Sequence, residues 1–235
     1  MVMEPRHRVP PRLHLLLRRD LATKASYASA YPVGFAPLFH HERLDAPSNT
    51  RVPADATTDP RRGRVFVCSM ADLFGTWVPQ EWIDRVYASM SAAPQWRYLT
   101  LTKFPQRYKR NGVPPHLWAG TSVDTQKRVR IAEESMREVP AAVRWLSVEP
   151  LEEPLTFNDL SWCDWVVIGS RTATNQPTGP VPAFAPPFEW VADLVAQARA
   201  AGAAVYLKPN LLGQVGPQSP GMALPQEMPA ERAAR

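Results

Sequence analysis

The sequence has only two cysteines, Cys68 and Cys163, and they lie far apart without a CxxC pair. This spacing matches no zinc-binding or disulfide pattern that can be recognised in a sequence. Glycine is also scarce, with 11 in 235 residues, and neither G-x-G-x-x-G nor G-x-x-x-x-G-K-[ST] occurs. The nucleotide folds that depend on those glycines are therefore disfavoured. We predict that both cysteines are buried apolar residues in a protein of a reducing, cytoplasmic compartment.

The histidines do not form a metal-binding pattern either. His40 and His41 are adjacent, the other three are scattered, and no HExxH motif is present. We predict no zinc centre, since the ligands of such a centre recur at short, regular spacings.

No apolar run is long enough to cross a membrane. The start RHRVPPRLHLLLRR resembles a signal peptide only superficially, because the apolar residues 15–17 are followed at once by charged ones. Much of the net charge of +5 lies in this start, so the basic balance is weak evidence for a nucleic-acid partner. We predict that residues 1–18 are an atypical, disordered start, and we expect no membrane partner.

From Arg64 onward, short apolar and β-branched runs recur and predict six strands. These runs are RVFVCSM, WRYLTLTKF, LWAGTSV, VRWLSVEP, DWVVIGS and AAVYLKP. They do not alternate cleanly with polar residues, as is typical of parallel strands that are covered on both faces.

Helical periodicity separates several of these runs, over residues 79–94, 124–139 and 186–202. In the second of these helices, Asp124 or Thr125 is the expected cap. Its apolar positions 129, 132, 136 and 139 fall on one face, and its charged residues, Arg128 among them, fall on a solvated face. Strands alternating with helices indicate right-handed crossovers and a parallel sheet. We predict an α/β fold, a partial (β/α) TIM-type barrel of about six parallel strands in one domain over 19–213, followed by a flexible tail over 214–235. A doubly wound open sheet is the alternative.

In either architecture, ligands bind beyond the carboxyl ends of the strands. Polar residues follow every predicted strand there, which favours a polar pocket. The candidate rim residues are Ser69, Asp72, Lys103, Ser122, Asp124, Glu149 and Lys208. No catalytic role is assigned to any of them.

The two lysines of this rim have several chemical uses. Lys103 or Lys208 could hold a phosphate or carboxylate, or form an imine with a carbonyl substrate. Each could equally form an ion pair with Glu149 or Asp72. Glu149 could accept a hydrogen bond from an amine or hydroxyl group of a ligand.

Seven blocks in fixed order carry a family resemblance over Arg19 to Gly213. They are YPVGFAPLFHHERLDAPSNT, VFVCSMADLFGTWVPQEWI, APQWRYLTLTKFPQR, WAGTSVDTQKRV, VRWLSVEPLEEPLTF, DWVVIGS and AAVYLKPNLLG. In this order they resemble the phage-associated radical-SAM-like family of unknown function, whose domain is sometimes found beside a ParB-like segment. The resemblance implies a partial barrel, a [4Fe-4S] cluster held by three clustered cysteines, and S-adenosylmethionine.

The chain departs from that pattern where the cysteines are expected, since it reads RLHLLLRRDLA and has no cysteine before Cys68. We therefore expect no bound cluster or other cofactor and no radical catalysis. Two explanations stay open: a decayed family member, or a start altered by a frameshift or a misassigned initiation.

Two further functions stay open. One is a cluster-free nucleic-acid-binding module that uses Trp77, Trp82, Trp96 and Trp118, with nucleic acid or a ParB-like protein as partner. The other is a barrel lyase in which Lys103 or Lys208 forms a Schiff base and Glu149 carries a proton.

Overall fold

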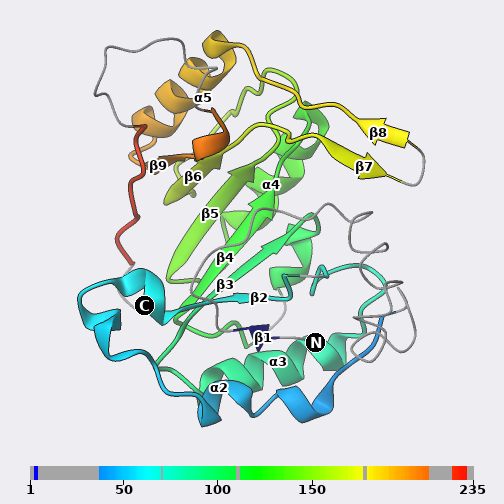
Figure 1. The fold of residues 1–235 in the computed structure, drawn as a ribbon, viewed down its shortest axis with the longest axis vertical. Helices are drawn as coiled ribbons and strands as arrows, with labels where there is room; N and C mark the ends of the chain where they lie inside the picture. Colours follow the sequence, from blue (N-terminus) through cyan, green and yellow to red (C-terminus); the bar gives the residue numbers. More distant parts are fainter. Residues whose placement is uncertain are drawn as a thin grey trace. The chain divides into compact units, whose positions relative to one another are not determined.

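The computed structural model describes residues 3–4, 37–69, 71–109, 112–176, 179–211 and 224–231. The chain is an α/β protein with a six-stranded parallel sheet (Figure 1). The parallel strands are β2 (Arg64–Val67), β3 (Arg97–Thr102), β4 (Leu117–Ser122), β5 (Val143–Val148), β6 (Trp165–Ile168) and β9 (Ala204–Leu207). Each lies inside one of the runs predicted from the sequence, which confirms all six.

The sheet has the strand order β1-β2-β3-β4-β5-β6-β9. The six parallel strands thus follow one another in chain order without reversal. Strand β1 (Met3–Glu4) is antiparallel to β2. It is the described part of the start 1–18, and the rest of that predicted disordered segment lies outside the described residues. Strand order does not establish closure, so the barrel stays a prediction.

The chain divides into two compact units, Met1–Thr100 with Thr174–Val181 and Leu101–Ala173 with Pro182–Arg235. The first unit includes α2 (Ala46–Asn49), α3 (Gln80–Ala92) and the antiparallel hairpin of β7 (Thr174–Gln176) and β8 (Gly179–Val181). The second includes β4, β5, β6, β9, α4 (Val129–Met136) and α5 (Phe188–Ala200). Strand β3 runs through the boundary between the units.

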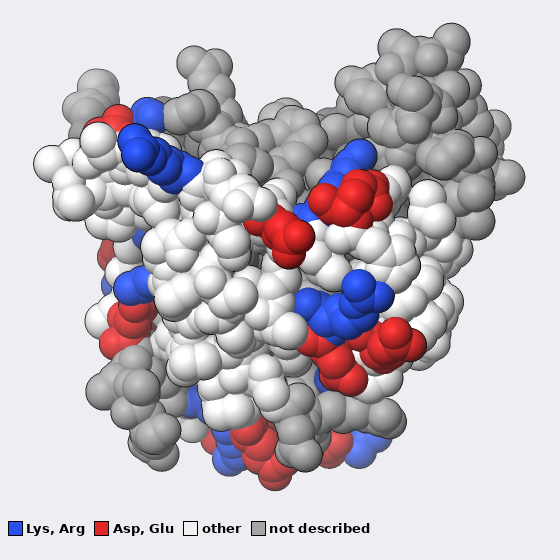
Figure 2. All heavy atoms as spheres, turned by 90° about the horizontal axis from the view of Figure 1, so that it is seen from below, with Lys and Arg blue, Asp and Glu red and all other residues white. Residues whose placement is uncertain are grey.

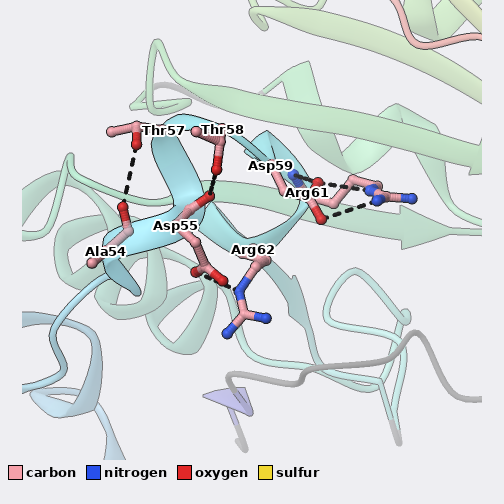
Figure 3. A network of polar contacts seen from close by, with 7 residues as sticks. All are labelled: Ala54, Asp55, Thr57, Thr58, Asp59, Arg61 and Arg62. Atoms are coloured by element: carbon pink, nitrogen blue, oxygen red, sulfur yellow. Dashed lines mark hydrogen bonds and ion pairs between the residues drawn. The ribbon is translucent and has the colours of Figure 1, made fainter.

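In the first unit, the segment directly before β2 forms two short 3-10 turns, η3 (Ala54–Thr57) and η4 (Pro60–Gly63). Figure 3 shows the ion pair that links them, in which Arg62 Nε lies 2.6 Å from Asp55 Oδ1, and a second one at the start of η4, in which Arg61 Nε donates to Asp59 Oδ1 at 2.7 Å. The hydrogen bond from Arg61 lowers the pKa of the Asp59 carboxyl. Side chains thus fix a segment that contains no strand or α-helix.

In the second unit, every residue of β5 and β6 is buried, as we predicted for parallel strands covered on both faces. Helix α5 packs against β6 and β9 and buries Val191, Leu194 and Ala198. Gly202, with φ of +76°, follows its last turn in the left-handed conformation that suits glycine. No helix in the described part of the chain is long and apolar enough to span a bilayer.

Helix α4 is shorter than predicted, because the 3-10 turn η6 (Gln126–Arg128) precedes it. Its buried side includes Val129, Ala132 and Met136, as the periodicity predicted.

Candidate ligand-binding site

Three residues follow directly on β5, β6 and β9 and form one row. The last residues of these strands are partners in the parallel register. Gly169 N donates to Val148 O at 3.0 Å, and Lys208 N donates to Ile168 O at 2.9 Å. The parallel pattern thus continues one step beyond the strands, and it brings Glu149, Gly169 and Lys208 side by side at their carboxyl ends.

Glu149 and Lys208 form an ion pair across this row. Lys208 Nζ lies 2.6 Å from Glu149 Oε2. A Cβ at Gly169 would lie 2.8 Å from Glu149 Cγ and 3.0 Å from its Cδ, closer than packed carbon atoms approach. The Glu149 side chain therefore lies where any other residue at 169 would place a carbon. Its exposed fraction is 7%, against 22% for Lys208, so solvent reaches the pair from the lysine side.

The loops around this pair are tied to one another. Ser170 Oγ donates to Asn210 O at 2.7 Å, and Asn210 Nδ2 donates to Ser170 O at 2.9 Å. Arg171 forms an ion pair with Glu152 in the loop after β5. The connections after β5, β6 and β9 are thus cross-linked by side chains, which holds Glu149 and Lys208 in a defined geometry.

A second charged group follows β3 and β4 in the same unit. Lys103 Nζ contacts Asp124 Oδ2, and Arg128 Nε lies 2.9 Å from Asp124 Oδ1. Arg128 also donates to Lys103 O at 3.3 Å. Burial raises the pKa of the Asp124 carboxyl, but the hydrogen bond and charge of Lys103 and the charge of Arg128 outweigh it, so the pKa is lowered. Two cations thus share the carboxylate of Asp124.

Arg128 was missed by the sequence prediction, which placed it on the solvated face of a helix. The i, i+4 spacing from Asp124 to Arg128 was the available signal, because such pairs meet on a helical turn.

Ser122 lies beside the buried Ser147 in the register of β4 and β5. Side chains alternate between the faces of a strand, so Trp145 and Ser147 share a face of β5. The rings of Trp118, Trp145 and Tyr206 all contact that of Trp165, with centroids 5.6 to 6.0 Å apart. This face is aromatic toward the amino ends of the strands and polar toward the carboxyl ends.

Ser69 and Asp72 belong to the first unit, in the turn that ends β2. Cys68, with φ of +55°, reverses the chain there. Asp72 Oδ1 accepts a hydrogen bond from Phe74 N at 2.9 Å, which stabilises the turn. The other five candidates lie in the second unit. A common site that also includes Ser69 and Asp72 stays a prediction.

The cysteines do not fit an iron–sulfur cluster, which takes several clustered thiolates. Cys68 and Cys163 are the only cysteines in the sequence, and both are buried. Cys163 Sγ donates to Trp165 O at 3.3 Å, and burial raises its pKa to about 12. Within the described ranges, no three His, Cys, Asp or Glu residues gather as metal ligands would.

The four tryptophans considered for nucleic-acid stacking differ in exposure. Trp96 and Trp118 are buried, whereas Trp77 has an exposed fraction of 51%. Figure 2 shows one face of the molecule, on which described Lys and Arg side chains lie beside Asp and Glu side chains. A stacking platform for nucleic-acid bases needs exposed aromatic rings in a basic groove. Because Trp96 and Trp118 are buried, neither contributes an exposed ring.

A family model matches residues 18–221, and the chain therefore belongs to the family described as "protein of unknown function (DUF5131)". The matched range contains β2 to β9 and all seven candidate rim residues. No curated protein and no solved structure gave a significant match.

Proposed function

We propose that this chain is a radical-SAM-like, partial (β/α) barrel protein that works without an iron–sulfur cluster and binds a small charged molecule at the carboxyl ends of its parallel strands. The observation that carries this proposal is the enclosed ion pair of Glu149 and Lys208 beside Gly169. The family resemblance supports the barrel and the two buried cysteines support the loss of cluster chemistry. We therefore propose no radical reaction for this chain.

The strand order supports barrel-type winding. A doubly wound sheet reverses its strand order at a switch point, and ligands bind at that point. Here the six parallel strands keep chain order from β2 to β9, as they do around a TIM-type barrel. Ligands of such barrels bind at the carboxyl ends of the strands, where Glu149 and Lys208 lie.

The chemistry of the pair favours a zwitterionic ligand. Glu149 accepts hydrogen bonds from an ammonium or hydroxyl group, and Lys208 binds a carboxylate or phosphate. A ligand that carries both charges exchanges one internal ion pair for two intermolecular ones, so neither Glu149 nor Lys208 loses a charged partner. An α-amino acid group has these two charges on adjacent positions.

Isothermal titration with S-adenosylmethionine and with L-methionine tests this proposal, since both carry an α-amino acid group. We expect binding to the wild-type chain and a loss of at least about tenfold in affinity for Glu149→Gln and for Lys208→Met, as each removes one charged hydrogen bond. Glu134→Gln is the matched control, because it removes a carboxylate from an exposed pair on α4. Equal affinities in all four proteins would rule out the pair as the site, and no binding of either probe would rule out this ligand class.

A second candidate, the barrel lyase, is favoured by the same contact, because an amine and a carboxylate lie 2.6 Å apart. An imine forms from the Lys208 amine and a carbonyl carbon with release of water, and Glu149 would carry the proton. In the described geometry the ammonium is engaged by the carboxylate and has no free electron pair.

Borohydride reduction in the presence of pyruvate tests the lyase. Mass spectrometry should find a stable adduct on Lys208 in the wild-type chain and none in Lys208→Met. An unmodified Lys208 contradicts this function for 2-oxo acids. The nucleic-acid or ParB-like partner, the phage association and the cytoplasmic location stay predictions from the sequence.

A further inference from the structure

The C-terminal segment (residues 224–231) occupies the edge of β9. Tyr206 and Gln226 form an antiparallel bridge, and backbone hydrogen bonds of 2.8 and 2.9 Å flank it, from Leu207 N and from Glu227 N. An edge strand offers backbone groups to any extended chain. In this structure the chain's own C-terminal segment takes that place.

Glu227 is the main polar anchor of the segment. Its carboxylate accepts hydrogen bonds from Arg199 Nη1 at 2.7 Å and from Val205 N at 2.9 Å. The hydrogen bond from Arg199 lowers the pKa of the Glu227 carboxyl, so the carboxylate is charged at neutral pH. The guanidinium of Arg199 and the backbone N–H of Val205 thus bind the carboxylate at position 227 together.

Two tryptophans beneath the segment also donate to it. Trp165 Nε1 donates to Glu227 O at 3.0 Å, and Trp118 Nε1 donates to Glu231 Oε1 at 3.0 Å. The exposed fractions of Trp118 and Trp165 are only 3% and 8%. Rigid, buried indoles therefore present their N–H groups to whatever chain lies along the β9 edge.

The segment itself has no fully buried apolar side chain. None of residues 224–231 is buried, and Met228 has an exposed fraction of 36%. The Arg199–Glu227 pair is solvent-exposed on both sides, and such pairs contribute little stability. Local opening costs less free energy for a segment without a fully buried side chain than for the buried strands β5 and β6, so we expect the segment to leave before the strands beneath it unfold.

We propose that the β9 edge, with Arg199 and the indoles of Trp118 and Trp165, is a peptide-binding surface. Residues 224–231 occupy it in cis, and an extended acidic peptide of a partner protein replaces them by β-strand addition. The partner peptide carries a carboxylate at the position of Glu227. This surface shares no residue with the Glu149–Lys208 pair, so the inference is independent of the proposed function.

The test uses the full chain and a fluorescent peptide with the sequence of residues 224–231, LPQEMPAE. Glu227→Gln in the chain weakens the cis segment, so this variant should bind the free peptide about three- to fivefold more tightly than wild type. Glu134→Gln in the chain should not change the affinity, and a peptide with Gln at the position of Glu227 should bind more weakly. Equal affinity of wild type and Glu227→Gln, or no binding to either, overturns the proposal.

Hydrogen exchange in the unmodified chain gives a second measurement that needs no variant. The amides of Leu207 and Glu227 should exchange through local opening, faster than the amides of β5 and β6, and the free peptide should change their rates. Exchange of Leu207 and Glu227 only through global unfolding contradicts a releasable segment.

Discussion

Lys208 Nζ lies 2.6 Å from Glu149 Oε2, and the Glu149 side chain fills the space that a Cβ would need at Gly169, the residue that follows the strand between them. The residues that follow three neighbouring strands thus provide one carboxylate, one glycine and one ammonium. The carboxylate is enclosed, while the ammonium is partly open to solvent. For the ligand binding that we propose, this asymmetry predicts approach to the ammonium first and then competition for the carboxylate.

Gly169→Ala should displace Glu149, because the added Cβ would lie 2.8 Å from Glu149 Cγ. We expect a loss of about 1–3 kcal/mol in the free energy of unfolding, as is usual for overpacked sites, measured by urea denaturation. Gly63→Ala is the matched control, since its nearest contact would be an ordinary 3.7 Å to Ala56 Cβ. Similar losses for both variants would show that Gly169 is not specifically required.

Lys208→Met and Glu149→Gln should be coupled. Each change removes one charge of a largely enclosed pair, and we expect each to cost about 1–3 kcal/mol of stability, toward the lower end because Lys208 is partly exposed. The double variant should cost less than the sum by at least about 0.5 kcal/mol. Additive losses in chemical denaturation would mean that the pair contributes no interaction energy.

The Lys103–Asp124–Arg128 group should make the free energy of unfolding depend on pH in the acidic range. The folded-state pKa of Asp124 lies below its usual value of 3.8, so the group stabilises the fold above that value. This contribution is lost as the pH falls through the folded-state pKa. Unfolding free energies measured from pH 6 to pH 2.5 should therefore fall less steeply for Asp124→Asn than for wild type. Identical slopes would contradict the assignment.

Both cysteines should resist alkylation in the folded chain. Burial raises the pKa of Cys163 to about 12, so very little of the reactive thiolate exists at pH 8, and Cys68 is buried as well. Iodoacetamide should label neither residue under native conditions and both in 6 M guanidinium chloride, as counted by intact-mass spectrometry. Rapid native labelling of Cys163 would show that it is accessible.

Strands and helices could be predicted because their patterns are local. The six apolar runs each contain one observed strand, and Gly202 marks the end of α5. Parallel strands place their carboxyl ends at one edge, so Glu149 and Lys208 could be listed together as candidates without knowledge of their contact.

Contacts set by register and by distant chain segments could not be predicted. The close approach of Glu149 to Gly169 depends on the alignment of β5 with β6, which composition does not encode. The contacts of Glu227 with Arg199 and Trp165 depend on the path of the C-terminal segment. That segment lies in the tail over 214–235, which was predicted to be flexible, and the polar anchors along it were not anticipated.

Anaerobic reconstitution tests most directly the claim that this chain works without a cluster. The chain is incubated with ferrous iron, sulfide and dithiothreitol, desalted, and analysed for iron and for visible absorption, beside a Cys68→Ala, Cys163→Ala double variant. We predict the same trace of iron in both proteins and no sulfide-to-iron absorption band. About four irons per wild-type chain, with the band present and lost in the double variant, would contradict the account.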